Sequence, residues 1–197
     1  MAKLEPGVVT GDDYKTLLRA CKEDGYALPA VNIVGTNSAN AVLEAAAEAG
    51  SDVIVQLSNG GAQFFAGKGM KDSFKAKVLG AVSAAQHVHT VAREYGVAVV
   101  LHTDHANRAL IPWVSALVDR SEEAYERTGK PLFSSHMIDL SEESLEENID
   151  TCAKYLERFA KVCRFGAALL LADGRALGGV LQAFTPSPAA RFKEFTK

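Results

Sequence analysis

One unit that recurs four times along the chain constrains the fold more than any other feature. Each copy starts with a short apolar run rich in β-branched residues, ends that run in polar side chains and continues into a segment with helical spacing. The apolar runs are Ala27–Asn32, Val53–Ser58, Val97–His102 and Leu132–Asp139. Strands that alternate with helices are typical of βα units, whose strands lie parallel in one sheet. The sequence therefore predicts an α/β fold of about four βα units.

The segments around these runs predict helices over residues 12–23, 38–49, 78–95 and 141–161. The last is the clearest, because apolar residues from Leu145 to Phe159 fall at helical spacing and form one stripe. Ser141 precedes the stripe and is expected to cap the helix, since its hydroxyl can accept a bond from a free backbone N–H. The acidic residues 142–147 are expected to form a solvated face of this helix.

The composition changes after Val162. Residues 163–197 carry 5 basic and 2 acidic side chains, whereas the whole chain carries 21 basic and 24 acidic ones. Only one run in this segment, Ala167–Ala172, looks like a strand, and the alternation of strands and helices is otherwise expected to stop. We therefore expect a barrel fragment over residues 1–162. An unrelated, poorly ordered tail over residues 163–197 would follow, of the kind that a shifted reading frame or altered splicing produces.

Composition also limits the partners. A net charge of -3 gives no electrostatic reason to expect a nucleic acid, and 48% hydrophobic residues are typical of a globular protein rather than a disordered one. No apolar stretch is long enough to cross a membrane, and the first residues lack the pattern of a secretory signal, so we expect a cytoplasmic protein. Cys21, Cys152 and Cys163 are odd in number and widely spaced, which favours free thiols over disulfides or a thiolate zinc site.

Polar side chains follow each predicted strand. In sheets built from βα units the carboxyl ends of the strands share one edge, where loops carry the functional groups. The polar groups are Asn32, residues 58–61, residues 102–105 and residues 134–139. We therefore expect one site at this edge.

Two of these groups suggest particular chemistry. His102, Asp104 and His105 could supply a metal ligand and a general acid or base, or the histidines could simply be hydrogen-bonded residues of the rim. Ser58 and the two glycines that follow at 60 and 61 could hold a phosphate, or could form a plain turn. The sequence leaves both alternatives open.

Four segments, in the same order and at matching spacing, resemble class II, metal-dependent fructose-1,6-bisphosphate aldolases. They are residues 28–32 (LPAVN), 53–61 (VIVQLSNGG), 101–105 (LHTDH) and 129–144 (GKPLFSSHMIDLSEES). The resemblance covers about Pro6 to Val162. It implies a TIM, or (β/α)₈, barrel, of which this chain would hold a part. It also implies a lyase that reversibly cleaves fructose 1,6-bisphosphate to dihydroxyacetone phosphate and glyceraldehyde 3-phosphate with the help of zinc.

The resemblance also implies roles for five residues. His105 would be a ligand of the catalytic zinc, and Asp139 a ligand of a second metal position. Asp104 would be the catalytic acid or base that handles the proton of the aldehyde oxygen. Ser58 would contact the substrate on its glyceraldehyde phosphate side, and Asn32 would be a further substrate contact. Members of the family are commonly homodimers.

The chain departs from the family after Val162. Family members continue with a glutamate-bearing strand and with two more zinc histidines, but residues 163–197 contain no histidine. We therefore expect the chain to be inactive alone, and the open edges of a partial barrel to make it unstable or associated. Two alternatives remain, namely a non-catalytic aldolase fragment that acts as an interaction module, or an aldolase for another ketose bisphosphate such as tagatose or sedoheptulose bisphosphate.

Overall fold

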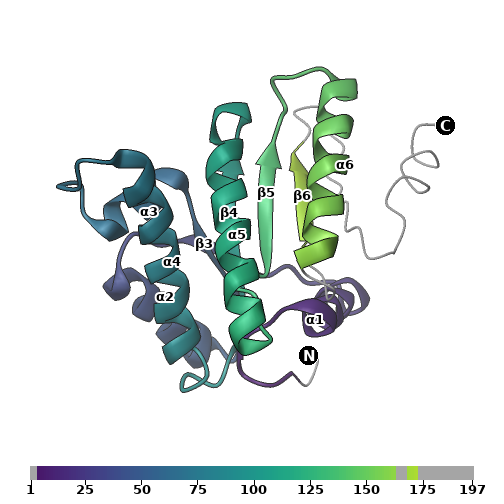
Figure 1. Ribbon diagram of the computed structural model, residues 1–197. Helices are drawn as coiled ribbons and strands as arrows, with labels where there is room; N and C mark the ends of the chain where they lie inside the picture. The colour runs from purple at the N-terminus through teal and green to yellow at the C-terminus, as the bar shows by residue number, and fades with distance from the viewer. Residues whose placement is uncertain (1–3, 163–167, 173–197) are drawn as a thin grey trace.

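A computed structural model describes residues 4–162 and 168–172 of the 197-residue chain. Its centre is a parallel sheet in the order β2-β3-β4-β5-β6, with β1 paired to β4 beside this path (Figure 1). The strands are β1 (Gly7–Val8), β2 (Ala30–Asn32), β3 (Val53–Leu57), β4 (Ala98–Ala106), β5 (Ser135–Asp139) and β6 (Ala168–Ala172). The helices are α1 (Gly11–Asp24), α2 (Thr36–Ala49), α3 (Asn59–Ala66), α4 (Ser73–Val91), η1 (Arg108–Leu110), α5 (Ile111–Thr128) and α6 (Leu145–Val162). The predicted α/β fold of parallel βα units is confirmed.

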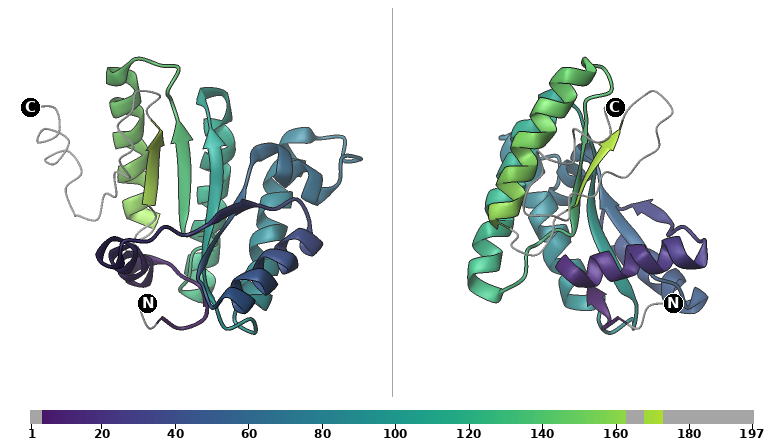
Figure 2. Two further views of the ribbon diagram at one scale, coloured as in Figure 1. Left: turned by 180° about the vertical axis from the view of Figure 1, so that it is seen from behind. Right: turned by 90° about the vertical axis from the view of Figure 1, so that its right-hand side faces the viewer.

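Alternation along β4 divides the core between the two faces of the sheet. Successive side chains of a strand point to opposite faces. Val99 and Leu101 belong to the larger cluster, which packs beneath the helices that cover one face. Ala98 and Val100 belong to a second cluster with Leu17 of α1. Accordingly α4, α5 and α6 lie on one face of the sheet and α1 on the other (Figures 1 and 2).

β1 and β5 both pair with β4, at different points along its length. β1 pairs with the start of β4 at Ala98 and Val99, whereas β5 pairs with its later residues from His102 onward. Ser134 joins the three strands, because its Oγ donates to the Val9 carbonyl at 2.6 Å and accepts from the Leu101 N–H at 2.9 Å. β1 and β5 thus follow one another along one edge of β4 while β3 pairs with the other edge, and the polar residues near the end of β4 are fixed in the sheet.

Helix α3 was not predicted from the sequence, and it depends on a close approach to α4. A Cβ atom at Gly80 of α4 would lie 1.7 Å from the Ala62 carbonyl oxygen of α3. Only glycine allows the two backbones to come this close. The contact holds α3 directly after β3, next to the carboxyl edge of the sheet.

Several predicted boundaries are wrong. β4 extends to Ala106, so residues 102–105 lie within the strand rather than after it. α6 starts at Leu145, and Ser144, not Ser141, accepts the N–H bond of Glu147 at 3.2 Å. Ser141 instead lies in the turn before α6, where its N–H donates to Asp139 Oδ1 at 3.2 Å. α5 was missed.

The sheet continues beyond residue 162. β6 pairs with β5 in parallel, with Ser135 opposite Ala168 and Asp139 opposite Ala172. The strand predicted at Ala167–Ala172 is therefore confirmed within one residue. Residues 163–167 and 173–197, with Cys163 and most of the predicted tail, lie outside the described residues. Among the helices that the structure describes, none is long and apolar enough to cross a membrane.

Candidate functional site

The register of the sheet brings residues from β2 and β4 together. Asn32, the last residue of β2, lies opposite Gln56 of β3, and Gln56 lies opposite His102 of β4. Two residues after His102 along β4, Asp104 Oδ2 accepts a hydrogen bond from the Asn32 Nδ2 at 2.9 Å. Two side chains from strands that are not neighbours therefore meet at the carboxyl edge, as the sequence predicted.

A bulge in β4 changes the direction in which the His105 side chain points. The pairing of β4 with β5 shifts register between Thr103 and Ala106, and inside this interval His105 has φ 27°. A non-glycine residue at positive φ is strained by about 1–3 kcal/mol and persists only where its surroundings fix it. In a regular strand Asp104 and His105 would point to opposite faces. Here the His105 Nε2 lies 3.8 Å from Asp104 Oδ1, so both side chains belong to one site.

Asp139 at the end of β5 completes the group. Its Oδ2 lies 2.7 Å from His105 Nδ1. Burial would raise the pKa of Asp139, but hydrogen bonds from His105 and Ser141 outweigh this effect and hold the pKa below its usual value. An ionised carboxylate only accepts hydrogen bonds, so Nδ1 carries a proton and donates. The lone pair of Nε2 on the neutral ring is then free for a metal ion, as is typical of metal-binding histidines supported by a carboxylate.

The other histidines of the two strands do not belong to this group. His102 Nδ1 lies 2.7 Å from Ser135 Oγ, and His136 Nδ1 lies 2.8 Å from Thr103 Oγ1. Both rings are buried, and burial lowers the pKa of His102 to about 4 and that of His136 to about 3. They are neutral hydrogen-bonded links between β4 and β5. His102 thus fits the second of the two alternatives, although it lies inside the sheet rather than at the rim.

Ser58 follows β3 at the same edge but has a different immediate role. Its Oγ accepts from the Gly61 N–H at 3.0 Å and caps α3. Residues 59–61 are the first turn of this helix, rather than a plain turn or an open loop. Of the five predicted site residues, the structure connects Asn32, Asp104, His105 and Asp139 by direct contacts, and it places Ser58 in the neighbouring cap.

The metal ligands are incomplete in the described part of the chain. There, no group of three or more His, Cys, Asp or Glu side chains is arranged to hold a metal ion. His105 is a suitable donor for a catalytic zinc and Asp139 for a second metal position, but a catalytic zinc takes three protein ligands. The donor chemistry therefore fits zinc, while the number of donors requires further residues.

A second ionic group beside the site was not predicted. Arg108, three residues after His105, donates from Nε to Glu143 Oε1 at 2.7 Å, and its Nη2 lies 3.7 Å from Glu147 Oε1. A cleft next to it is lined by Asn107, Arg108, Ala109, Asp139, Leu140, Glu142 and Glu143. Glu143 and Glu147 were expected to be part of a solvated helix face. The sequence signal for this group was Arg108, a basic residue shortly after His102 and His105. Its pairing with Glu143 and Glu147 depends on the fold and could not be predicted from the sequence.

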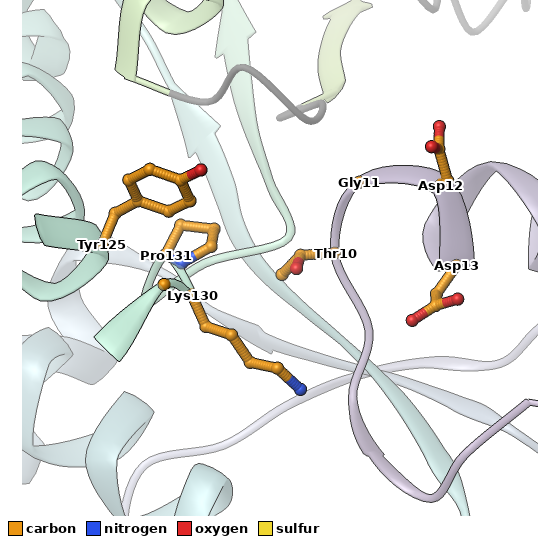
Figure 3. Close-up of a pocket in the computed structure, with 8 residues that line it drawn as sticks. Thr10, Gly11, Asp12, Asp13, Tyr125, Lys130 and Pro131 are labelled. Atoms are coloured by element: carbon orange, nitrogen blue, oxygen red, sulfur yellow. The ribbon is translucent and has the colours of Figure 1, made fainter. Parts of the chain in front are cut away.

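A further pocket lies on the side where β5 begins. It is lined by Thr10, Gly11, Asp12, Asp13, Tyr125, Gly129, Lys130 and Pro131 (Figure 3). Residues 129–131 precede β5, so this pocket lies away from the carboxyl edge that holds Asp104 and His105. In proteins built from βα units the carboxyl edge carries the chemistry. The pocket is therefore not the candidate site.

A parallel sheet whose strands β2 to β6 follow one another in chain order, with α4, α5 and α6 on one face, is typical of a part of a βα barrel. Comparison with known proteins is more specific. The sequence profile described as "Fructose-bisphosphate aldolase class-II" matches residues 12–164. The chain belongs to the class II fructose-bisphosphate aldolase family, and its sheet is a part of that family's TIM barrel.

Individual relatives agree with this assignment. Fructose-bisphosphate aldolase class 2 of Escherichia coli K12 is 58% identical over 161 residues, which are 81% of this chain and 45% of the relative. The fructose-bisphosphate aldolase of Borreliella burgdorferi is 50% identical over 165 residues, 83% of this chain and 46% of the relative. The crystal structure of the Campylobacter jejuni aldolase matches with a TM-score of 0.80 and 50% identity, over 85% of this chain and 47% of the other. The chain thus spans about half the length of these relatives.

Proposed function

We propose that the protein is a class II aldolase subunit that takes part in the reversible, zinc-dependent cleavage of fructose 1,6-bisphosphate to dihydroxyacetone phosphate and glyceraldehyde 3-phosphate. The observation that carries the proposal is the connected series Asn32, Asp104, His105 and Asp139 at the carboxyl edge of the sheet. The family assignment supports it. A cytoplasmic location and a homodimeric assembly are part of the same proposal.

In this proposal the chain's own groups have distinct roles. Asp104 transfers the proton of the aldehyde oxygen, and the Asn32 amide orients it by donating to Oδ2. His105 presents Nε2 to zinc, and Asp139 fixes the ring through Nδ1 while its carboxylate contributes to a second metal position. Ser58 contacts the substrate near the start of α3. When bound, zinc supplies Lewis acidity toward the ketone carbonyl of the substrate.

The remaining zinc ligands are proposed to come from a second polypeptide, because residues 163–197 contain no histidine. Of the residues assigned here, His105 supplies one donor to the catalytic zinc, whereas three protein ligands are typical. The half-length match to the relatives supports this reading. The chain alone is then expected to be inactive, whereas the chain together with the missing barrel half is expected to be active.

The test is reconstitution. The chain is co-expressed with the portion of the Escherichia coli relative that it does not match, and cleavage of fructose 1,6-bisphosphate is followed with and without a chelator. We expect cleavage that the chelator abolishes, and none when the chain carries Asp104→Asn. Cleavage that survives chelation would contradict zinc dependence. Tagatose and sedoheptulose bisphosphates are assayed in parallel, and a higher kcat/KM for either would change the proposed substrate.

A second candidate is a non-catalytic fragment that associates with another aldolase subunit. The observation that favours it is the outer strand β2, whose three residues are all exposed, with Val31 at 38%. An open strand edge is a ready surface for pairing with another chain. Co-purification with a full-length aldolase, combined with an inactive reconstituted complex, would favour this candidate over the enzyme.

A further inference from the structure

The ion pair of Arg108 joins two connections of the fold that are far apart in the sequence. Arg108 lies in η1, directly after β4, and Glu143 lies 35 residues later, between β5 and α6. Glu147, in the first turn of α6, is the second partner. The guanidinium group can serve two carboxylates from two of its nitrogens, which a lysine cannot do in the same geometry.

The connection that Arg108 reaches is the one that holds Asp139. In it the Ser141 N–H donates to Asp139 Oδ1 at 3.2 Å, and the Glu143 N–H donates to the Leu140 carbonyl at 3.0 Å. Asp139 therefore has one oxygen on the turn and the other on His105. Any shift of residues 140–143 would move the carboxylate relative to the imidazole.

We propose that Arg108 is a positioning residue. It acts through Glu143 on the turn at residues 140–143, and this turn holds Asp139 against His105. The bond to Asp139 selects the His105 tautomer with the proton on Nδ1, which leaves Nε2 free. The consequence for metal binding rests on the proposed function, but the geometric effect does not.

An exposed ion pair contributes little to stability, so a purely structural role for Arg108 predicts almost no local effect. A positioning role predicts an effect that is confined to residues 139–141 and to the His105 ring. The chain offers a matched control in Arg120 on α5. Its Nη1 donates to Glu123 at 2.8 Å, and the exposure of Arg120, 47%, is close to the 49% of Arg108.

The experiment compares Arg108→Gln with Arg120→Gln in the full chain by nuclear magnetic resonance. The first readout is the exchange rate of the Ser141 amide proton, with the Gly61 amide as an internal reference. The second is the tautomer of His105, read from its ring nitrogen shifts at pH 9. Arg108→Gln is expected to accelerate Ser141 exchange about tenfold relative to Gly61 and to raise the population with the proton on Nε2. Arg120→Gln is expected to change neither.

A charge reversal provides the rescue. Arg108→Glu combined with Glu143→Arg restores an ion pair between the two connections and is expected to return both readouts toward those of the wild type. The proposal would be overturned if Arg108→Gln changed the Ser141 exchange rate and the His105 tautomer population no more than Arg120→Gln does. A failed reconstitution of aldolase activity would instead contradict the proposed function, and it would leave the exchange and tautomer results unaffected.

Discussion

Asp104 accepts a hydrogen bond from the side-chain amide of Asn32 at 2.9 Å, although the two residues are 72 positions apart in the sequence. Strand β3 lies between their strands β2 and β4. The contact therefore spans a whole strand at the carboxyl edge, where curvature of a twisted sheet brings strand ends together. Because the amide donates to Oδ2, it fixes the orientation of the Asp104 carboxylate.

Asp104 and His105 are adjacent, but their substitutions are expected to have different effects. In the reconstituted enzyme, Asp104→Ala should lower kcat by about 10²–10⁴-fold because proton transfer is lost, and zinc affinity should remain close to that of the wild type. His105→Ala should lower both activity and zinc affinity. Competition with a chromophoric chelator measures the affinity, and an unchanged value for His105→Ala would contradict its role as a ligand.

Stability is expected to fall as the pH is lowered from about 6.5, because of His102 and His136. Burial lowers their pKa values to about 4 and about 3, whereas an unfolded histidine titrates near 6.5. Below pH 6.5 the unfolded chain binds more protons than the folded chain, so the free energy of unfolding decreases. Each ring contributes up to about 1.4 kcal/mol per pH unit until its own folded pKa is reached.

Urea unfolding at pH 7.5, 6 and 5 measures this dependence. His136→Gln should be less stable than the wild type at pH 7.5, because the ring and its bond to Thr103 are lost. Its stability should nevertheless depend less steeply on pH, since one titrating group is absent. Identical slopes for the two proteins would show that His136 is not a buried neutral ring.

Gly80→Ala is expected to destabilise the fold. The added Cβ would lie 1.7 Å from the Ala62 carbonyl oxygen, and since backbone atoms must move apart the cost should be about 1–3 kcal/mol or more. Gly60→Ala in α3 is the control, because no atom lies within 4 Å of its Cβ position. It should be neutral or stabilise by less than about 1 kcal/mol. Thermal unfolding compares the two, and equal midpoints would contradict the close approach of α3 and α4.

Cys152 is expected to be unreactive in the folded protein. It is fully buried in α6, and burial raises the pKa of its thiol to about 12, so almost no thiolate exists at neutral pH. Cys21 in α1 is only partly buried and should react at least about tenfold faster with a thiol reagent. Peptide mapping after timed alkylation measures both rates, and equal rates would indicate that α6 does not remain packed.

The sequence was sufficient for β2 to β6 because their apolar runs reflect local pattern alone, whereas the two-residue strand β1 was not predicted. It was also sufficient to place Asn32, Asp104, His105 and Asp139 at one edge, since parallel strands end on the same side. Helix α5 could have been found as well. Pro112 near its start and apolar residues from Trp113 to Ala124 at helical spacing are ordinary signals of a helix.

Other features could not be read from local pattern. Helix α3 contains Gly60 and Gly61, which are poor helix formers, and it forms because α4 packs against it. The bulge in β4 depends on how β4 pairs with β5, and the pairing of Arg108 with Glu143 depends on the loops that follow them. These are contacts between distant segments, and no single stretch of sequence specifies them.

The bulge in β4 also sets the stability of the sheet against the geometry of the candidate site. Deleting one residue between Thr103 and Ala106 would let β4 pair regularly with β5 and would remove the strained φ of His105. The same deletion would turn the imidazole away from Asp139. The extra residue in β4 therefore costs the sheet regular pairing, and this cost is set against the contact between His105 and Asp139 that the bulge makes possible.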